Sequence, residues 1–112
     1  MKYAMVIINT QEWEPLTEAD REFESLARWW ADLRAGGKIV AAARLALPRT
    51  GSTVSWRGQV PIVTDGPYVE AKEAVGGFVL LDVDSEAEAL EIASSWPNKV
   101  GTRIEVRLTL EI

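Results

Sequence analysis

Apolar segments and amphipathic segments alternate along this chain, and their order limits its fold more than any other feature of the sequence. Residues 3–8 form a near-continuous apolar run, which is typical of a buried central strand. Residues 102–110 alternate apolar and polar side chains, which predicts a strand with one buried face. Further strands are predicted at residues 38–47, 53–57, 59–64 and 77–83. The second and third of these flank Arg57-Gly58 and predict a hairpin.

A first helix is predicted between Thr17, a residue type that favours the N-cap, and the pair Gly36-Gly37, which favours a helix end. The carboxylates of Glu18 and Asp20 favour the positive end of the helix dipole. Apolar residues at three- and four-residue spacing form one stripe between these limits: Phe23, Leu26, Ala27, Trp30 and Leu33. The stripe predicts that one side of this helix packs against the core.

A second helix is predicted to begin after Ser85 and to end before Pro97. Glu88 follows Ser85 by three residues, as in a capping box, in which each of the two side chains bonds the backbone of the other residue. The residues predicted to face the core are Leu90, Ala93 and Trp96.

The resulting order of elements is strand, helix, strand, hairpin, strand, helix, strand. This order is the split βαβ pattern of a ferredoxin-like fold, so we predict an α+β domain, βαββαβ with a hairpin insertion. The chain has 112 residues, of which 47% are apolar and 26% are charged, and this fits one domain over residues 1–112. One face of such a sheet carries both helices, and the other face needs a cover that a second copy would supply.

The segment Asp65-Gly66-Pro67 predicts a tight turn at the end of the hairpin. Gly66 accepts a positive φ without a Cβ penalty, and Pro67 fixes its own φ, so the turn holds the Asp65 carboxylate in one direction. Two interpretations stay open at this point. The carboxylate either bonds its own backbone as part of the turn or serves as a site residue.

The pair Gly76-Gly77 lies at the start of a predicted strand. Without the other residues of a phosphate-binding fingerprint, a glycine pair does not indicate a phosphate loop. The close approach of a neighbouring backbone explains this pair better.

Short motifs run over nearly the whole chain: Lys2-Tyr3, Gly36-Gly37, Arg57-Gly58, Asp65-Gly66-Pro67-Tyr68, Glu70-x-Lys72-Glu73 and Gly76-Gly77-Phe78. Together they resemble the YCII-related family, in the branch that is named for an Asp-Gly-Pro-Phe motif (DGPF domain), with Tyr68 at the position of the Phe. The resemblance implies a homodimer in which two sheets pair as a dimeric α/β barrel. YCII proteins are proposed to use a histidine together with an aspartate, and this sequence contains no histidine.

Composition argues against several kinds of partner and cofactor. Seventeen acidic and twelve basic residues give a net charge of −5, and no two Lys or Arg residues are adjacent, so nucleic acid is not an expected partner. Cysteine and histidine are both absent, which removes the usual ligands of zinc and redox metals, so we expect no metal and no cofactor. The N-terminal apolar run is too short for a signal peptide or a membrane span, so we expect a cytoplasmic protein without a membrane partner.

Asp65 is the candidate catalytic residue, because the chain has no histidine or cysteine that could act as acid, base or nucleophile. Arg44 lies at the end of an apolar stretch, so it either sits on the exposed face by alternation or points into a cavity where it holds an anion. Tyr68 and Lys72 follow the turn at Asp65 and are, with Arg44, candidate substrate-binding residues.

Five tryptophans are more than a chain of this length usually carries. Trp30 and Trp96 are predicted core residues because of their spacing. Trp13, Trp29 and Trp56 either line a pocket, form an interface or pack on the surface. We include Trp13 and Trp56 among the candidate substrate-binding residues.

Three functions stay open on the sequence. The first is a homodimeric protein with a small-molecule pocket near Asp65 that acts on a small lactone or an aromatic-derived acid. If this protein is an enzyme, it is a cofactor-free lyase, isomerase or dehalogenase type with Asp65 as acid or base. Relatives of the YCII fold include a muconolactone-type dehalogenase, and this analogy is at the level of the fold alone.

The second function is an accessory or regulatory module that binds a protein partner through Trp13 and Trp56. Proteins of the Asp-Gly-Pro-Phe branch resemble partners of extracytoplasmic-function sigma factors, so the resemblance implies this alternative. The third function is a structural dimer whose pocket has no function.

Overall fold

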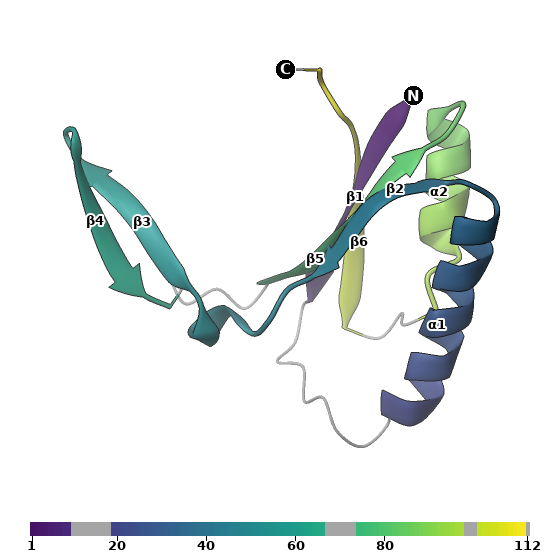
Figure 1. Ribbon diagram of the computed structural model, residues 1–112, viewed down its shortest axis with the longest axis horizontal. Helices are drawn as coiled ribbons and strands as arrows, with labels where there is room; N and C mark the ends of the chain where they lie inside the picture. The colour runs from purple at the N-terminus through teal and green to yellow at the C-terminus, as the bar shows by residue number, and fades with distance from the viewer. Residues whose placement is uncertain (10–18, 67–73, 98–100, 112) are drawn as a thin grey trace.

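The computed structural model describes residues 1–9, 19–66, 74–97 and 101–111 of the chain (Figure 1). Its strands and helices follow the order predicted from the sequence. The elements are β1 (Lys2–Asn9), α1 (Ala19–Ala35), β2 (Ile39–Arg44), a short 3-10 turn η1 (Pro48–Thr50), β3 (Ser52–Arg57), β4 (Val60–Asp65), β5 (Ala74–Asp82), α2 (Glu86–Ser94) and β6 (Thr102–Leu108).

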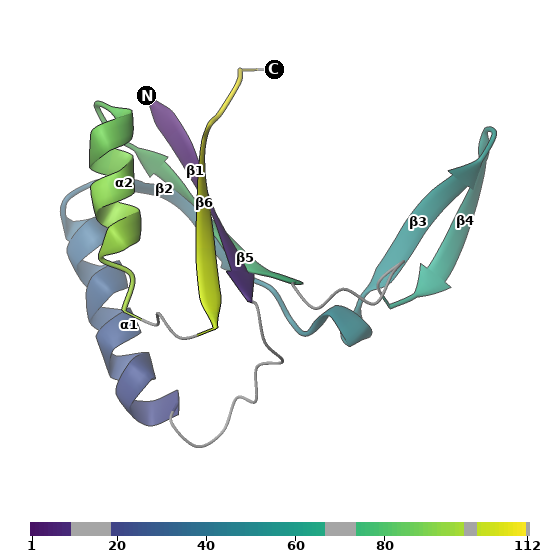
Figure 2. The ribbon, with the colours of Figure 1, turned by 180° about the vertical axis from the view of Figure 1, so that it is seen from behind.

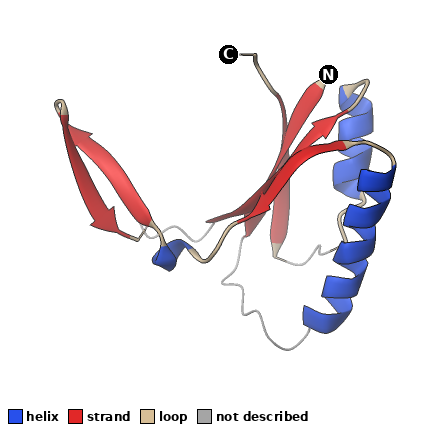
Figure 3. Ribbon diagram, in the orientation of Figure 1, coloured by secondary structure: helices blue, strands red, loops and turns tan. Residues whose placement is uncertain are grey.

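Four strands form one antiparallel sheet in the order β2-β5-β1-β6, and β3 pairs with β4 in a separate hairpin (Figure 3). Because β1 and β2 both run antiparallel to β5, they are parallel to each other, and α1 joins them across β5. In the same way, α2 joins β5 to β6 across β1. These connections are two split βαβ units. The predicted α+β domain with a four-stranded sheet and a hairpin insertion is therefore confirmed.

Both helices lie on the same face of the sheet, as the views from the front and from behind show (Figures 1 and 2). Alternate residues of each strand point to that face and form the core together with residues of the helices. Met5 of β1 and Val79 and Leu81 of β5 are fully shielded from solvent. The other core residues are Tyr3, Ile7, Trp29, Val83, Ala89 and Trp96.

The opposite face of the sheet, which we call the open face, has no cover among the described residues. The register pairs Val6 with Phe78 and Ile8 with Val75, at positions that alternate with the buried residues of β1. Phe78 and Val75 are 41% and 46% exposed. The open face is therefore apolar over the middle of β1 and β5. The same register places five charged residues on it, which are Lys2 and Asp82 at one end of β1 and β5, and Arg103, Glu105 and Arg107 along β6 at the sheet edge.

Trp29 is a core residue, and this finding corrects the prediction that it lies in a pocket wall, an interface or the surface. Its ring packs edge-on against those of Trp30 and Trp96, at centroid distances of 5.1 Å and 5.0 Å. Its Nε1–H donates a hydrogen bond of 2.8 Å to Ser95 Oγ. This hydroxyl, just beyond α2, satisfies the indole donor, so a second tryptophan of α1 can be buried. The predicted core positions of Trp30 and Trp96 are confirmed, with Trp30 partly buried.

The face of α2 that packs on the core is centred one residue away from the face that the sequence predicted. Ala89 is fully buried, and Ile92 and Ala93 pack against the core. Leu90, which was predicted to face inward, is 47% exposed. Positions 89, 92, 93 and 96 follow helical spacing, and Leu90 lies about 100° around the helix from Ala89.

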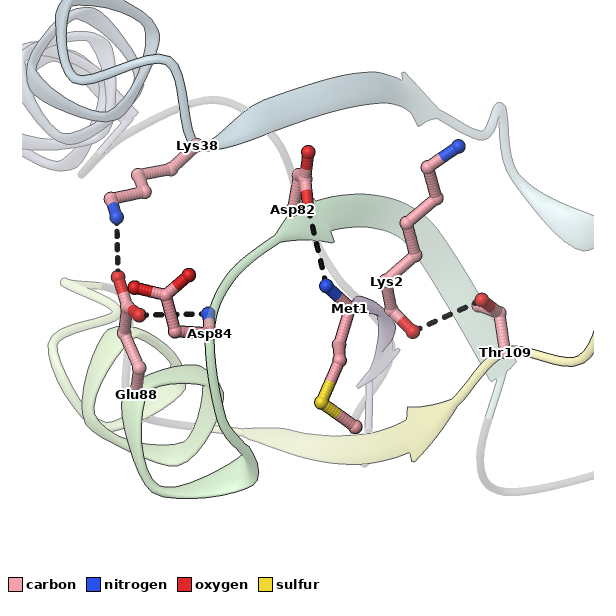
Figure 4. Close-up of polar contacts among 7 residues, drawn as sticks. All are labelled: Met1, Lys2, Lys38, Asp82, Asp84, Glu88 and Thr109. Carbon is pink, nitrogen blue, oxygen red and sulfur yellow. Dashed lines mark hydrogen bonds and ion pairs between the residues drawn. The ribbon is translucent and has the colours of Figure 1, made fainter.

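Ser85 caps α2 as predicted, because its Oγ accepts a hydrogen bond of 3.2 Å from the N–H of Glu88. The reciprocal bond reaches one residue further back than in the predicted capping box. Glu88 Oε2 accepts a hydrogen bond of 3.1 Å from the N–H of Asp84, and Glu88 Oε1 forms a 2.6 Å ion pair with Lys38 Nζ (Figure 4). One carboxylate thus joins the start of α2 to the segment between α1 and β2.

These contacts change the pKa values of both charged groups. The hydrogen bond from Lys38, and after it the backbone hydrogen bond from Asp84, lowers the pKa of Glu88 below its ordinary value of 4.5. The hydrogen bond to Glu88 raises the pKa of Lys38. Because the folded state depresses the pKa of Glu88, this carboxylate stabilises the fold above its ordinary pKa. The stabilisation is lost as the pH falls through the folded-state pKa.

We predict that Glu88→Gln lowers the melting temperature at neutral pH, and that the difference from the wild type narrows as the pH falls below 4.5. Calorimetric scans over this pH range measure the effect. Glu91→Gln, at an exposed position of the same helix, is the matched control and should change the melting temperature little at any pH. If the wild type has a higher melting temperature than Glu88→Gln by an amount that does not vary with pH, the role of the ionised carboxylate is contradicted.

Candidate functional site

A pocket of about 430 Å³, which we call the sheet-end pocket, lies at one end of the sheet on its helix-covered face. β1 and β2 end there, and β5 and β6 begin there, so all four strands contribute to its lining. Leu26 and Trp30 of α1, together with Trp96 beyond α2, form its helical wall. The remaining lining residues are Ile7, Asn9, residues 43–48, residues 74–77 and Thr102.

Arg44 lines the sheet-end pocket and is its one charged residue among those described. It is the last residue of β2 and pairs with Gly77, two positions after Ala42 pairs with the buried Val79. Side chains two residues apart on a strand share a face, so this register places Arg44 on the helix-covered side of the sheet. Of the two predicted alternatives, the position toward a cavity is the observed one, and the residue remains exposed to solvent.

The glycine pair at the start of β5 brings β2 and β5 close together beside Arg44. A Cβ on Gly77 would stand 2.7 Å from the carbonyl oxygen of Ala43, which is closer than real Cβ atoms come. A Cβ on Gly76 would meet the side chain of Asn9. The predicted close backbone approach is therefore confirmed, and it shapes the floor of the pocket.

Sequence reasoning did not identify the polar residues Asn9 and Thr102 as pocket residues. Trp30 and Trp96 were assigned to the core alone, whereas each also lines the pocket. The one signal in the sequence for Asn9 was its place directly after the apolar run of β1, because a polar residue there sits at the sheet end. Thr102 follows Gly101, which has a φ of 68° and marks the entry to β6.

Asp65 is the last residue of β4 and is exposed, and it is not among the residues that line the sheet-end pocket. Gly66 has the predicted positive φ, 77°, and Pro67, the last residue of the predicted turn, lies outside the described residues. The Gly66 N–H donates a hydrogen bond of 2.7 Å to the Gly51 carbonyl, and the Gly66 carbonyl accepts one of 2.6 Å from Thr53 Oγ1. Asp65 therefore stands where the two strands of the hairpin join the rest of the chain, and its catalytic role stays a prediction.

The other candidate residues do not meet in one described site. Trp56 is 66% exposed in β3 and lies in the hairpin, away from the sheet-end pocket. Trp13, Tyr68 and Lys72 lie outside the described residues. Within the described chain, the structure thus brings Arg44 to a pocket and leaves Asp65 and Trp56 on the hairpin.

The sheet-end pocket has the chemistry of an anion site with apolar walls. Its walls are mostly aliphatic and aromatic, and its polar side chains are a guanidinium, an amide and a hydroxyl. No carboxylate lines it among the described residues. Nor do the described residues contain a cluster of three potential metal ligands of the Asp, Glu, His or Cys types.

A second hollow, of about 280 Å³, lies between α2 and β6. It is lined by Leu90, Ala93, Ser94, Trp96, Thr102, Ile104 and Val106. Among the described residues its polar side chains are the hydroxyls of Ser94 and Thr102 and the indole of Trp96, and none is charged. Within the described part of the chain, no helix is both long enough and apolar enough to cross a membrane.

We predict that Gly77→Ala lowers the free energy of unfolding by roughly 1–3 kcal/mol, the cost of overpacking against a fixed backbone group. The new methyl group would press on the Ala43 carbonyl, which cannot move without disturbing the pairing of β2 with β5. Gly76→Ala is the matched variant and should cost less, because the side chain of Asn9 can rotate away. Urea unfolding of both variants tests this, and equal losses would contradict it.

Two comparisons with known proteins bear on the family of this chain. The sequence pattern of the YCII-related domain matches residues 1–109. Uncharacterized protein R00369 of Rhizobium meliloti (strain 1021) is similar to this chain, with 32% identity over 102 residues that cover 88% of this chain and 82% of that protein. The name of this relative states no function, and the Asp-Gly-Pro-Phe branch stays a prediction. The match extends over nearly the whole sequence, so the chain belongs to the YCII-related domain family.

Proposed function

We propose that this protein binds a small aromatic carboxylic acid in the sheet-end pocket. The observation that carries the proposal is the position of Arg44, a guanidinium at the edge of a pocket whose other walls are largely apolar. Arg pairs with carboxylates through two parallel hydrogen bonds, which fixes the orientation of a planar acid. The ring of such an acid would then lie against Leu26 and Trp30.

The size of the pocket supports a ligand of this kind. Pockets for small molecules usually have volumes of about 300–1,000 Å³, apolar walls and few polar groups. The sheet-end pocket, at about 430 Å³, lies at the small end of that range. It therefore suits a single ring with a short acidic substituent better than a nucleotide or a cofactor.

The proposal concerns the binding of a ligand. Catalysis by Asp65 is a separate question. A lyase, isomerase or dehalogenase reaction without a cofactor needs an acid or base within hydrogen-bond reach of the substrate. In the described chain Asp65 stands on the hairpin and not in the pocket. Catalysis by Asp65 would therefore need an arrangement other than the one seen in the described part of this chain.

The same proposal includes a homodimer, supported by the surface of the single chain. A compact monomer of 12.4 kDa has about 6,100 Å² of accessible surface, whereas this chain has 8671 Å². Its radius of gyration is 16.0 Å, against about 13 Å for a compact domain of 112 residues. The excess of about 2,500 Å² per chain is what a large permanent interface buries on each partner. Paired open faces, as in a dimeric α/β barrel, would remove much of it.

An accessory protein-binding module is the second candidate function. Its support is Trp56, a large aromatic side chain that is 66% exposed in the hairpin, where a protein partner could cover it. A partner such as an extracytoplasmic-function sigma factor would then use the hairpin, and the sheet-end pocket would bind no acid.

We predict that benzoate binds the wild type and changes its tryptophan fluorescence, because Trp30 and Trp96 line the pocket. Arg44→Gln should weaken binding by about tenfold or more, the loss expected for a charge-assisted hydrogen bond. Benzamide, a neutral ligand of nearly the same shape, should bind the wild type as weakly as benzoate binds the variant. Fluorescence titration and calorimetry measure these affinities.

The control variant is Arg57→Gln, which removes the same charge from the hairpin and should leave the affinity for benzoate unchanged. Circular dichroism shows whether each variant is folded. Equal affinities of the wild type and Arg44→Gln, or of benzoate and benzamide, would contradict a carboxylate site at Arg44.

We also predict that Asp65→Asn keeps the affinity for benzoate within about twofold of the wild type, because an exposed charge outside the pocket is screened by salt. A thermal-shift titration of both proteins in parallel measures this, since a ligand of the native state raises the melting temperature. If Asp65→Asn abolishes the shift as fully as Arg44→Gln does, Asp65 belongs to the ligand site and the assignment of the pocket must change.

A further inference from the structure

The β3–β4 hairpin, which we call the arm, stands away from the sheet and helices in both views of the chain (Figures 1 and 2). It hydrogen-bonds as a two-stranded sheet of its own and does not join the main sheet. An isolated hairpin of two strands is marginally stable in water and needs a further surface to pack on. The arm is therefore an element whose partner lies outside the described part of its own chain.

One face of the arm is apolar. The register pairs Val54 with Val63 and Trp56 with Pro61, and these four side chains share a face because they alternate along their strands. We call this the apolar arm face. On the other side of the hairpin, the pairs are Thr53 with Thr64, Ser55 with Ile62 and Arg57 with Val60.

The apolar arm face is open to solvent in the single chain. Trp56 and Val63 are each 66% exposed and Val54 is 47% exposed, so three apolar side chains stand together in water. Exposed apolar groups that lie side by side on one face mark an interaction surface. Trp56 belongs to this surface, and tryptophan is among the residue types that most often anchor a protein interface.

The open face of the sheet is the second unpartnered apolar surface of the described chain. It presents Val6, Ile8, Val75 and Phe78, and charged residues border this apolar part along β6 and at the Lys2–Asp82 pair. An apolar centre with a polar rim is the anatomy of a stable protein interface. One chain thus carries a projecting apolar arm and an uncovered apolar sheet, and the arm points away from the sheet of its own chain (Figure 1).

A second copy of this chain fits both surfaces at once. In a two-fold dimer each contact occurs twice, so if the arm of one chain packs on the sheet of the other, the reverse contact also forms and the assembly closes. The excess surface of about 2,500 Å² per chain has the magnitude of an obligate contact.

We propose that the arm is a dimerisation element, whose apolar face packs on a second copy of this chain with Trp56 as its anchor. This inference rests on the proposed homodimer and adds the element that holds it together. Asp65 stands on the same face of β4 as Val63, two residues away, so the surface that covers the arm also borders this carboxylate. The environment of the predicted catalytic residue is then set by the partner chain.

Two valines of β4 give a matched test. Val63 lies on the apolar arm face and is 66% exposed, whereas Val60 lies on the opposite face and is 64% exposed. We expect Val63→Glu to weaken self-association by roughly thirtyfold or more, the loss seen when an interface hot spot is disrupted. Val60→Glu adds the same charge to the same strand and should leave the wild-type dimer intact. Analytical ultracentrifugation over a range of micromolar concentrations measures both.

The outcomes separate the arm from the homodimer. A folded wild type that remains monomeric at these concentrations overturns both proposals, and benzoate binding still tests the pocket by itself. A wild-type dimer that Val63→Glu and Val60→Glu leave equally stable overturns the arm alone. Dissociation by both variants also overturns the arm, because the loss would then not depend on the face.

A second measurement needs no disruption of the interface. A photo-reactive phenylalanine analogue replaces Trp56, and the protein is mixed with an isotope-labelled copy that lacks the analogue before illumination. We expect cross-linked pairs of one labelled and one unlabelled chain, with the cross-link in β1, β2 or β5 of the labelled copy. The same analogue at Arg57, on the opposite face, should give few such pairs. Cross-links confined to single chains, or equal yields from both positions, would overturn the proposal.

Discussion

The packing of both helices on one face of the sheet determines the rest of this structure. Each helix joins two parallel strands across an intervening strand, and the two units run in opposite directions across the sheet. Two crossovers of the same hand, arranged in this way, must place their helices on the same face. Trp29, Trp96 and Met5 then fill one core layer, and Val6 and Phe78 are left on a face that the described chain does not cover.

The sheet-end pocket follows from the same packing. The helices cover the middle of the sheet. At the end of the sheet, the helices and the strands leave a space that the core does not fill, and the rings of Trp30 and Trp96 line this space. Gly77 lets β2 approach β5 there, and this approach sets the position of Arg44. A cation at the edge of an apolar cavity needs no catalytic partner to be useful, because it selects for a carboxylate through charge and shape.

Periodicity and turn chemistry predicted the strands, the helices, the Ser85 cap and the positive φ of Gly66, because these depend on residues that are close in the sequence. The burial of Trp29 could not be predicted, because its indole N–H depends on an acceptor from another part of the chain. That acceptor is the hydroxyl of Ser95, just beyond α2. The pattern of β2 allowed two positions for Arg44, and only the register with β5 decides between them. The sequence marked Asp65 as unusual through its turn, but whether a surface covers it depends on contacts that no local pattern encodes.

The first strand in the order of the described elements, β1, lies in the middle of the sheet. β1 is bonded on one side to β5 and on the other to β6, so Lys2 pairs with Asp82, and Tyr3 pairs with Leu108. Close to Lys2, the Met1 ammonium group contacts Asp82 at 3.5 Å, and the Lys2 carbonyl accepts a hydrogen bond of 3.0 Å from Thr109 Oγ1 (Figure 4). During synthesis on the ribosome, the N-terminal strand must therefore wait for nearly the whole chain to emerge before its sheet can close. Such long-range pairing slows folding and leaves the apolar run of β1 exposed for most of translation.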